Sequence, residues 1–253
     1  MEPANEINKP FVVCHMLASL DGKIDGEFFS AQGSQPALAE YGKLRGFYGC
    51  QATLYGTTTM IGSYSDGVVQ ELLDISGSYP REDYAASAEE KNYIVSIDTK
   101  GILKWSSNYI EKKGRSRAYV IEVMTEAVSD EYLAYLRKFD ISYVFAGKEQ
   151  LDCGLLLRKL KEKFSIDRLM IAGGGAINWS FLQEGLIDEL SLIMVPVADG
   201  SSTAVSIFEK SQFFPGGGAV SFELREVKQM EGGSLWLRYV PGNKKTERIG
   251  GRL

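Results

Sequence analysis

Runs of apolar residues alternate with polar, glycine-containing segments along most of the chain. Residues 11–18 (FVVCHMLA) are almost all apolar, which predicts a strand buried on both faces. After a glycine-containing turn, residues 35–49 place apolar side chains three and four positions apart, which is typical of a helix. Short apolar runs predict three further strands, at 52–55, 92–96 and 117–123.

Strands and helices alternate more regularly from residue 129 onward. Ser129 is placed to cap a helix that runs to about Phe139, and two more helices are predicted over 151–164 and 176–183. The strands expected in this region are 141–145, 168–172 and 190–197. Strands interleaved with helices of this length favour βαβ units around a mostly parallel sheet.

The last third of the chain has a different pattern. Residues 220–230 (VSFELREVKQM) and 234–240 (SLWLRYV) read as two strands, and Gly232-Gly233 lies between them. Two strands joined across a Gly-Gly turn predict an antiparallel hairpin. The predicted fold class is therefore α/β, a mixed, mostly parallel central sheet flanked by helices and closed by a C-terminal antiparallel hairpin.

Neither a linker nor an internal repeat divides the chain, so we interpret residues 10–241 as a single domain. Residues 62–91 are rich in Ser, Gly, Asp and Tyr, which predicts an insertion or long loop with short helical pieces. The polar segments 1–9 and 242–253 are expected to be flexible ends.

Composition narrows the functional classes. The net charge of -5 argues against nucleic acid as the main partner, because phosphate backbones favour a concentrated basic surface. Three widely spaced cysteines and a single histidine form no metal-ligand pattern and leave little basis for a Ser-His-Asp triad. The chain has no signal-peptide layout and no apolar run of roughly 20 residues, so we expect a cytoplasmic protein that does not enter a membrane.

A strand, three glycines and a helix follow one another in RLMIAGGGAINWSFLQEG, at residues 168–185. Backbone N–H groups and a helix N-terminus at Gly173, Gly174 and Gly175 would favour an anion such as a pyrophosphate. The segment is not a GxGxxG fingerprint, because Asn178 occupies the position of the last glycine. The alternative interpretation is a tight turn that needs glycine for steric reasons.

Several single residues allow both a functional and a structural interpretation. Thr57, Thr58 and Thr59 can bind phosphate or ribose oxygens, or simply cap a helix. Asp21 follows the first strand, where a carboxylate can relay a proton or form the Asp-Gly turn. His15 lies in a buried strand, which favours a hydrogen-bonded core histidine.

Taken in order, these motifs resemble one known family. ASLDGK at 18–23, LYGTTT at 54–59, YIVS at 93–96 and the block 171–197 (IAGGGAINWSFLQEGLIDELSLIMVPV) resemble the C-terminal reductase domain of bacterial riboflavin biosynthesis. The resemblance covers roughly residues 10 to 240, and the block at 171–197 is its most specific part. It implies a dihydrofolate-reductase-like fold and hydride transfer from NADPH, or from NADH, to a ribosylamino-pyrimidine phosphate.

The resemblance also implies roles for individual residues. Asp21 would be the catalytic residue, on the substrate side. Ser19 is expected to bind the substrate. Independently of the resemblance, Lys43 and Arg45 lie on the helix after the first strand, where they can face a phosphate of the substrate or be surface charges. The dinucleotide would be contacted by Ala18, Gly56, Thr59, Ser96, Gly173, Gly174 and Gly175.

The chain departs from the family pattern at three points. Ala172 stands where many members have a glutamate that holds the pyrimidine. We therefore expect the acceptor to be either a 5-amino-6-ribosylamino-pyrimidine phosphate or a related pteridine-like compound. Ile97 replaces a basic residue that commonly supports the 2′-phosphate of NADPH, and Lys100 is the available substitute. The H-x-E and PCxxC signatures of the deaminase half are missing.

Two other functions remain open at this point. One is a non-catalytic module that binds a dinucleotide or metabolite with the same fold, and the other is a dihydrofolate reductase. The family resemblance further implies a homodimer, for which we expect the apolar strand 188–197 to be the contact.

Overall fold

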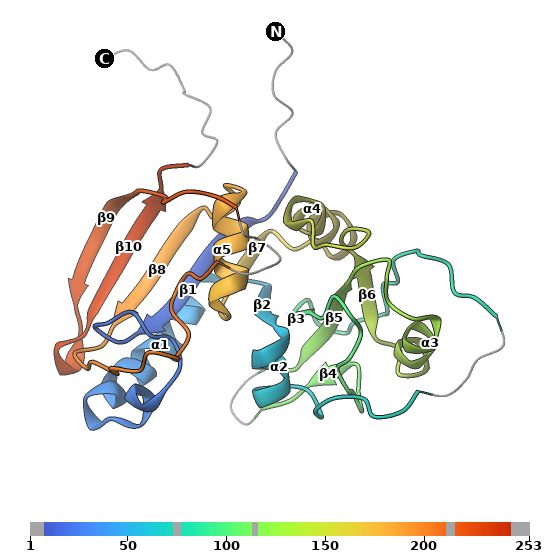
Figure 1. Ribbon diagram of the computed structural model, residues 1–253, viewed down its shortest axis with the longest axis horizontal. Helices are drawn as coiled ribbons and strands as arrows, with labels where there is room; N and C mark the ends of the chain where they lie inside the picture. The colour runs from blue at the N-terminus through green and yellow to red at the C-terminus, as the bar shows by residue number, and fades with distance from the viewer. Residues whose placement is uncertain (1–7, 73–76, 113–115, 211–215, 244–253) are drawn as a thin grey trace, which may run out of the picture.

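A ten-stranded sheet runs through the part of the chain that the computed structural model describes, residues 8–72, 77–112, 116–210 and 216–243 (Figure 1). Its strands are β1 (Phe11–Ala18), β2 (Ala52–Gly56), β3 (Tyr93–Ile97), β4 (Tyr109–Ile110), β5 (Ala118–Met124), β6 (Ser142–Phe145), β7 (Arg168–Ile171), β8 (Glu189–Met194), β9 (Phe222–Gln229) and β10 (Leu235–Pro241). The helices are α1 (Gln35–Tyr48), α2 (Thr57–Ser63), α3 (Asp130–Lys138), α4 (Cys153–Phe164) and α5 (Gly175–Gln183). The expected flexible ends, 1–9 and 242–253, lie largely outside the described residues.

Most of the sheet is parallel. β1 lies at its centre between β7 and β8, and β7 continues through β2 and β3 to β5 and β6, all in parallel register. These strands have near-continuous apolar runs because helices cover both faces of a parallel sheet. The predicted mostly parallel sheet is therefore confirmed. The two-residue strand β4, antiparallel to β5, was not predicted.

The C-terminal hairpin is also confirmed. β10 pairs antiparallel with both β8 and β9, which makes β9 one edge of the sheet. The turn contains Gly232 and Gly233 at φ angles of 73° and 78°, a left-handed conformation that glycine adopts without steric penalty. The class predicted from the sequence, a mixed α/β sheet with a C-terminal hairpin, describes the observed architecture.

Helices cover the two faces of the sheet unevenly. α4 and α5 pack on one face, where Leu156, Leu160 and Phe181 join a large apolar cluster with the strands. On the other face α1 and α3 contribute to two separate clusters. The two helices stand apart over the strands (Figure 1). Ser129 caps α3 as predicted, since its side chain accepts a hydrogen bond from the Tyr132 N–H.

The segment between α2 and β3 is a long loop, as predicted, but the short helical pieces expected within it are absent from its described residues. The loop is held by specific contacts. Tyr84 forms an isolated bridge to Tyr143 of β6, and Arg81 donates to the Val128 carbonyl at 2.8 Å. Asp83 pairs with Lys159 of α4 at 2.8 Å. The loop therefore extends the layer over the β5–β6 edge.

The strand expected to form a dimer contact is not available for one. β8 lies between β1 and β10, so both of its edges are paired, and its side chains are buried apart from Met194. The expectation of self-association through 188–197 is wrong because the C-terminal hairpin covers that edge. The sequence pattern does not reveal where the hairpin lies in the strand order.

Candidate functional site

Two helices begin side by side at the carboxyl edge of adjacent parallel strands. α2 starts directly after β2, and α5 starts after β7 through the turn Gly173-Gly174. A Cβ added at Gly56 would lie 3.2 Å from Ile177 of α5, and one added at Gly173 would lie 3.1 Å from Thr59 Oγ1 of α2. The glycines therefore allow the two helix starts to approach each other closely.

The start of α5 can receive an anion. Its N-cap residue is Gly174, at φ 79° and ψ 112°, and no side chain caps the helix. The first N–H groups of a helix have no partner within the helix, and the macrodipole adds partial positive charge at that end. An uncapped start at the carboxyl edge of a parallel sheet is the usual position of a bound phosphate group.

The three glycines of this turn have different roles. Gly173 permits the close contact with Thr59, and Gly174 adopts a left-handed conformation that L-residues rarely take. A Cβ at Gly175 would lie only 2.4 Å from the Ser206 carbonyl oxygen, so this glycine is required by packing. The steric interpretation therefore accounts fully for Gly175. Gly173 is buried beside Thr59, and Gly174 is the partly exposed glycine of the turn.

The threonines that follow β2 do not cap their helix. Gly56 is the N-cap residue of α2 and no side chain supplies a capping hydrogen bond. Thr57 instead donates to the Ile97 carbonyl at 2.6 Å, which ties α2 to the end of β3. Thr58 is exposed, and Thr59 lies beside Gly173. The capping interpretation is wrong for all three, and Thr59 faces the glycine turn.

The end of β1 forms a tightly hydrogen-bonded turn around Asp21. Its carboxylate accepts hydrogen bonds from Ser19 Oγ at 2.6 Å and from the N–H groups of Asp199 and Gly200 at 2.9 and 2.8 Å. These contacts, the one from Ser19 first, hold the pKa of Asp21 well below its ordinary value. The exposed Asp21 is therefore ionised at neutral pH, which favours a role in organising two loops over one in donating a proton.

Ala18 and Ser19 are also occupied by this turn. Ala18 is buried, and its carbonyl accepts from the Val195 N–H at 2.9 Å. Ser19 is buried as well, and its hydroxyl accepts from the Lys23 N–H at 2.9 Å while donating to Asp21. The backbone of this turn lies at the carboxyl end of β1, where Ala18 pairs with Met194 of β8, beyond Cys14, the last β1 residue paired with β7.

Ser96 has a different environment from the one that the family resemblance implies. It is fully buried in β3, directly opposite Glu122 of β5. Glu122 accepts from the Trp105 indole N–H, and the Ser96 hydroxyl is another polar side-chain group beside its buried carboxyl. Burial raises the pKa of Glu122 well above its ordinary value. Glu122 was missed in the sequence because one polar residue in an apolar strand is a weak signal.

His15 is a core histidine, as expected from its position in a buried strand. Nε2 lies 3.2 Å from the Tyr41 carbonyl and Nδ1 lies 2.9 Å from Ser191 Oγ. The imidazole stacks on the Tyr41 ring with 4.4 Å between centroids. Burial lowers its pKa to about 4, so the ring is neutral at physiological pH.

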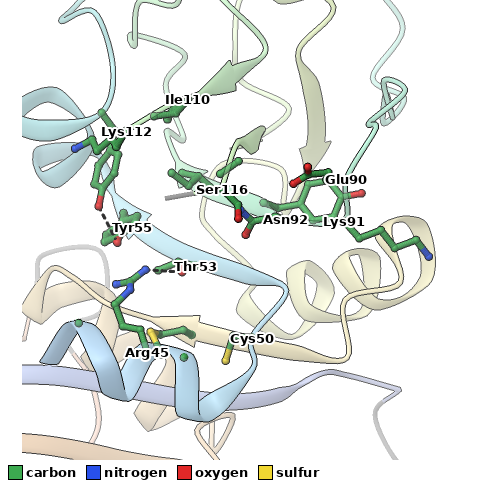
Figure 2. Close-up of a pocket in the computed structure, with 17 residues that line it drawn as sticks. Arg45, Cys50, Thr53, Tyr55, Glu90, Lys91, Asn92, Ile110, Lys112 and Ser116 are labelled. Atoms are coloured by element: carbon green, nitrogen blue, oxygen red, sulfur yellow. Dashed lines mark hydrogen bonds between the residues drawn. The ribbon is translucent and has the colours of Figure 1, made fainter. Parts of the chain in front are cut away.

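The fold separates the two cations that were expected to bind the substrate, Lys43 and Arg45. Lys43 has 71% of its side chain exposed and forms a surface ion pair with Glu40. Arg45, two residues further along α1, lines a groove of about 750 Å³ on the sheet face between α1 and the β4 region (Figure 2). The groove was not predicted, because its lining residues are distant in sequence: α1 combines with residues of β2 and β3 and with Ile110, Lys112, Ser116 and Ala118.

The described residues contain no group of three or more His, Cys, Asp or Glu side chains that could hold a metal ion. Within the same ranges, each helix is too short or too polar to cross a bilayer.

Comparison with known proteins identifies sequence relatives. The profile of the RibD C-terminal domain family matches residues 10–236. The 2,5-diamino-6-ribosylamino-4(3H)-pyrimidinone 5′-phosphate reductase of Methanothermobacter thermautotrophicus is 32% identical over 102 residues, which is 40% of this chain and 46% of that protein. The enzyme of the same name from Archaeoglobus fulgidus is 24% identical over 208 residues, 81% of this chain and 89% of that protein. The segment that matches the Methanothermobacter relative therefore spans less than half of that protein's length.

Solved structures share the fold. The RibD protein of Acinetobacter baumannii superposes with a TM-score of 0.62 at 22% identity over 92% of this chain and 58% of that one. A pyrimidine reductase-like protein from Corynebacterium diphtheriae gives a TM-score of 0.66 at 14% identity, with 93% of both chains covered. At these identities the similarity establishes the arrangement of strands and helices, which is the predicted dihydrofolate-reductase-like arrangement.

Proposed function

This chain belongs to the RibD C-terminal domain family, and we propose that it is an NAD(P)H-dependent reductase of a ribosylamino-pyrimidine 5′-phosphate. The observation that carries the proposal is the uncapped start of α5 beside α2 at the carboxyl edge of β2 and β7. Relatives named as pyrimidinone phosphate reductases support the same reaction class. The acceptor is the 2,5-diamino-pyrimidinone that appears in their names, or the 5-amino-pyrimidine expected from the family resemblance.

The residues at this edge fit a dinucleotide. The backbone N–H groups of Gly173 and Gly174 and the first turn of α5 would hold the pyrophosphate, since a Cβ at Gly173 would fill the space beside Thr59. Gly56 and Thr59 would contact the dinucleotide from α2, and the backbone of Ala18 would border the nicotinamide. A bound nicotinamide dinucleotide supplies the hydride. Gly175 and the Ser96 side chain are left out of this site because both are buried in packing.

The protein's own contribution is positioning. Asp21, ionised and hydrogen-bonded to Ser19, joins the end of β1 to the loop at residues 199–200. That fixes the backbone that borders the reacting atoms, and correct placement of reactants supplies much of the rate enhancement in such a reaction. Asp21 is therefore proposed as a positioning residue.

NADPH is the proposed cofactor, with NADH as the alternative. Ile97 at the end of β3 carries no charge for a 2′-phosphate, and the exposed Lys100 three residues later is the nearest cation along the chain. A Lys100→Met variant tests this directly. Its affinity for NADPH should fall several-fold while its affinity for NADH stays constant, because only NADPH has the additional phosphate.

The direct test of the proposal is a titration of the protein with NADPH and with NADH, followed by turnover assays with both pyrimidine phosphates and with dihydrofolate. Selective NADPH binding and its oxidation with a pyrimidine phosphate are expected. Dinucleotide binding without turnover of any acceptor would indicate the non-catalytic binding module instead. Turnover of dihydrofolate alone would indicate a dihydrofolate reductase. Absence of binding to either dinucleotide would contradict both the reductase and a dinucleotide-binding module.

We further propose a homodimer, formed through β9 instead of through β8. β9 is a sheet edge of eight residues with Leu224 and Val227 about half exposed, and such an edge can pair with a second copy across a two-fold axis. Val227→Lys should shift the protein to monomers in analytical ultracentrifugation. A dimer that persists in this variant, with unchanged dissociation constant, would contradict the placement at β9.

A further inference from the structure

A groove on the sheet face next to α1 has the composition of an anion site, and it is separate from the glycine turn. Its volume is about 750 Å³, which lies within the range of small-molecule sites. α1 forms one wall, β2, β3 and β7 contribute the floor, and the other wall is lined by Ile110, Lys112 and Ser116 (Figure 2).

Arg45 is the central charge of the groove. Its guanidinium donates to Thr53 Oγ1 at 2.9 Å and lies beside the hydroxyls of Tyr41 and Tyr55, all of them neutral groups. No carboxylate lies within ion-pair distance of Arg45 among the described residues. Three other partly buried cations differ in this respect, since Lys9, Lys159 and Arg238 each pair with a carboxylate at 2.7 or 2.8 Å. A guanidinium withdrawn from water without a counter-charge favours an anionic ligand.

A second cation approaches the same end of the groove. The Lys112 ammonium lies 3.9 Å from the centre of the Tyr64 ring, and the Tyr64 hydroxyl donates to Tyr55 at 2.9 Å. The Tyr55–Tyr64 pair therefore lies between Arg45 and Lys112. Figure 2 shows these two cations toward one end, with Glu90 and Lys91 toward the other. Arg45 and Lys112 therefore lie together at one end, next to phenol hydroxyls that can also donate to a phosphate oxygen.

The remaining walls leave room for a planar ring. Gly42 and Gly46 lie one turn apart on α1, and a Cβ added at either would meet no atom within 4 Å. Ile94 and Met170 supply an apolar floor. Glycine within a helix lowers its stability relative to alanine, yet here two glycines keep the backbone of α1 open toward the groove.

We propose that this groove is a binding site for a phosphorylated aromatic heterocycle of mononucleotide size, with the phosphate on Arg45 and Lys112 and the ring between α1 and the apolar floor. The site lies on the face of the sheet, whereas the proposed dinucleotide site lies at the carboxyl edge. The proposal therefore does not depend on the reductase activity.

Uridine 5′-monophosphate is a suitable probe, because it combines a pyrimidine ring, ribose and phosphate. Calorimetric titration should show binding of the monophosphate and at least tenfold weaker binding of uridine, since the phosphate contributes charge-assisted hydrogen bonds. Arg45→Met keeps the length of the side chain and should weaken monophosphate binding about tenfold or more, whereas Arg45→Lys should recover part of it. Lys112→Met, at an exposed position, should give a smaller loss of several-fold.

Two further variants separate the groove from general effects. Arg158→Met removes one positive charge from exposed α4, on the opposite face, and should leave monophosphate affinity unchanged. Gly42→Leu should fill the groove and abolish monophosphate binding while NADPH affinity stays constant. The proposal is overturned if the monophosphate does not bind at millimolar concentration, or if folded Arg45→Met and Gly42→Leu variants bind it as the wild type does. Competition by NADPH would instead place the monophosphate at the carboxyl edge and also overturn the proposal.

Discussion

The buried His15 gives the protein a pH-dependent stability whose size can be worked from its contacts. The Trp236 indole N–H donates to Ser191 Oγ at 2.9 Å, so the Ser191 hydroxyl proton is available for His15 Nδ1. The Tyr41 carbonyl can only accept, so Nε2 carries the ring proton. Both nitrogens of the neutral ring are thus hydrogen-bonded. A second ring proton, on Nδ1, would point at the Ser191 hydroxyl proton, which is already directed toward Nδ1.

Burial is the main cause of the lowered pKa, and the Arg45 charge adds to it. The pKa falls from 6.5 to about 4 on folding. Between these two values the unfolded chain binds a proton that the folded protein does not bind, so stability is fully present above pH 6.5 and decreases as pH falls. A slope of about 1.4 kcal/mol per pH unit over this interval gives a total loss of about 3 kcal/mol.

Urea unfolding of the wild type and of His15→Gln, followed by tryptophan fluorescence at about pH 7, 6 and 5, measures this loss. The variant should be less stable at pH 7, because it loses the stacking on Tyr41, but the difference between the two proteins should shrink toward acid pH. Other titrating groups affect both proteins equally. Since the chain has one histidine, its imidazole resonance can be titrated directly by NMR. A constant difference in unfolding free energy, or an imidazole that titrates near its ordinary pKa, would refute the reasoning.

Three further predictions follow from individual residues. Glu122→Gln should raise the free energy of unfolding relative to the wild type, increasingly as pH rises above about 4.5. Burial keeps Glu122 protonated in the folded protein, whereas the unfolded chain loses that proton. Chemical unfolding at several pH values measures the difference, and a pH-independent difference would contradict the prediction. Gly174→Ala should lower stability by about 1 to 2 kcal/mol, because Gly174 has a left-handed backbone, and it should also weaken NADPH binding. Gly42→Ala, within helix α1, should instead raise stability by about 0.5 to 1 kcal/mol. Thermal unfolding and NADPH titration compare the two variants. Asp21→Asn should reduce turnover by roughly 10²-fold without changing the pH profile of kcat, because Asp21 is ionised throughout the neutral range. If the variant instead lost a titration step in that profile, Asp21 would have a proton-transfer role.

The sequence pattern predicted the central elements well because their signals are local. β1 has the bounds predicted from its apolar run, and Ser129 caps α3 through a hydrogen bond three residues away. The Gly232-Gly233 turn identified the hairpin for the same reason. In each case the physical cause of the structure lies within a few residues of sequence, where periodicity and capping preferences act.

The prediction failed where the outcome depends on residues far apart in the chain. The position of β8 inside the sheet is set by its pairing with β10, more than forty residues later. The contact of Ser96 with the dinucleotide, which the family resemblance implies, stays a prediction; the fold places its side chain opposite Glu122 in the β3–β5 pair, which the sequence did not reveal. Alternation along a strand indicates which residues share a face, but it does not indicate what the neighbouring strand places opposite them.

The contrast between Lys43 and Arg45 links these limits to the function. Both are basic residues on α1, two positions apart, and their side chains therefore point to different sides of the helix. The sheet packs against one side, which turns Arg45 toward the groove and leaves Lys43 in solvent with Glu40. Ala172 follows β7 two residues after the groove residue Met170, and it is the position where the family resemblance implies a substrate-binding glutamate. Replacement of a carboxylate by a methyl group removes a negative charge from this position, so an anionic ligand that binds near Arg45 meets less repulsion here than in a chain that keeps the glutamate.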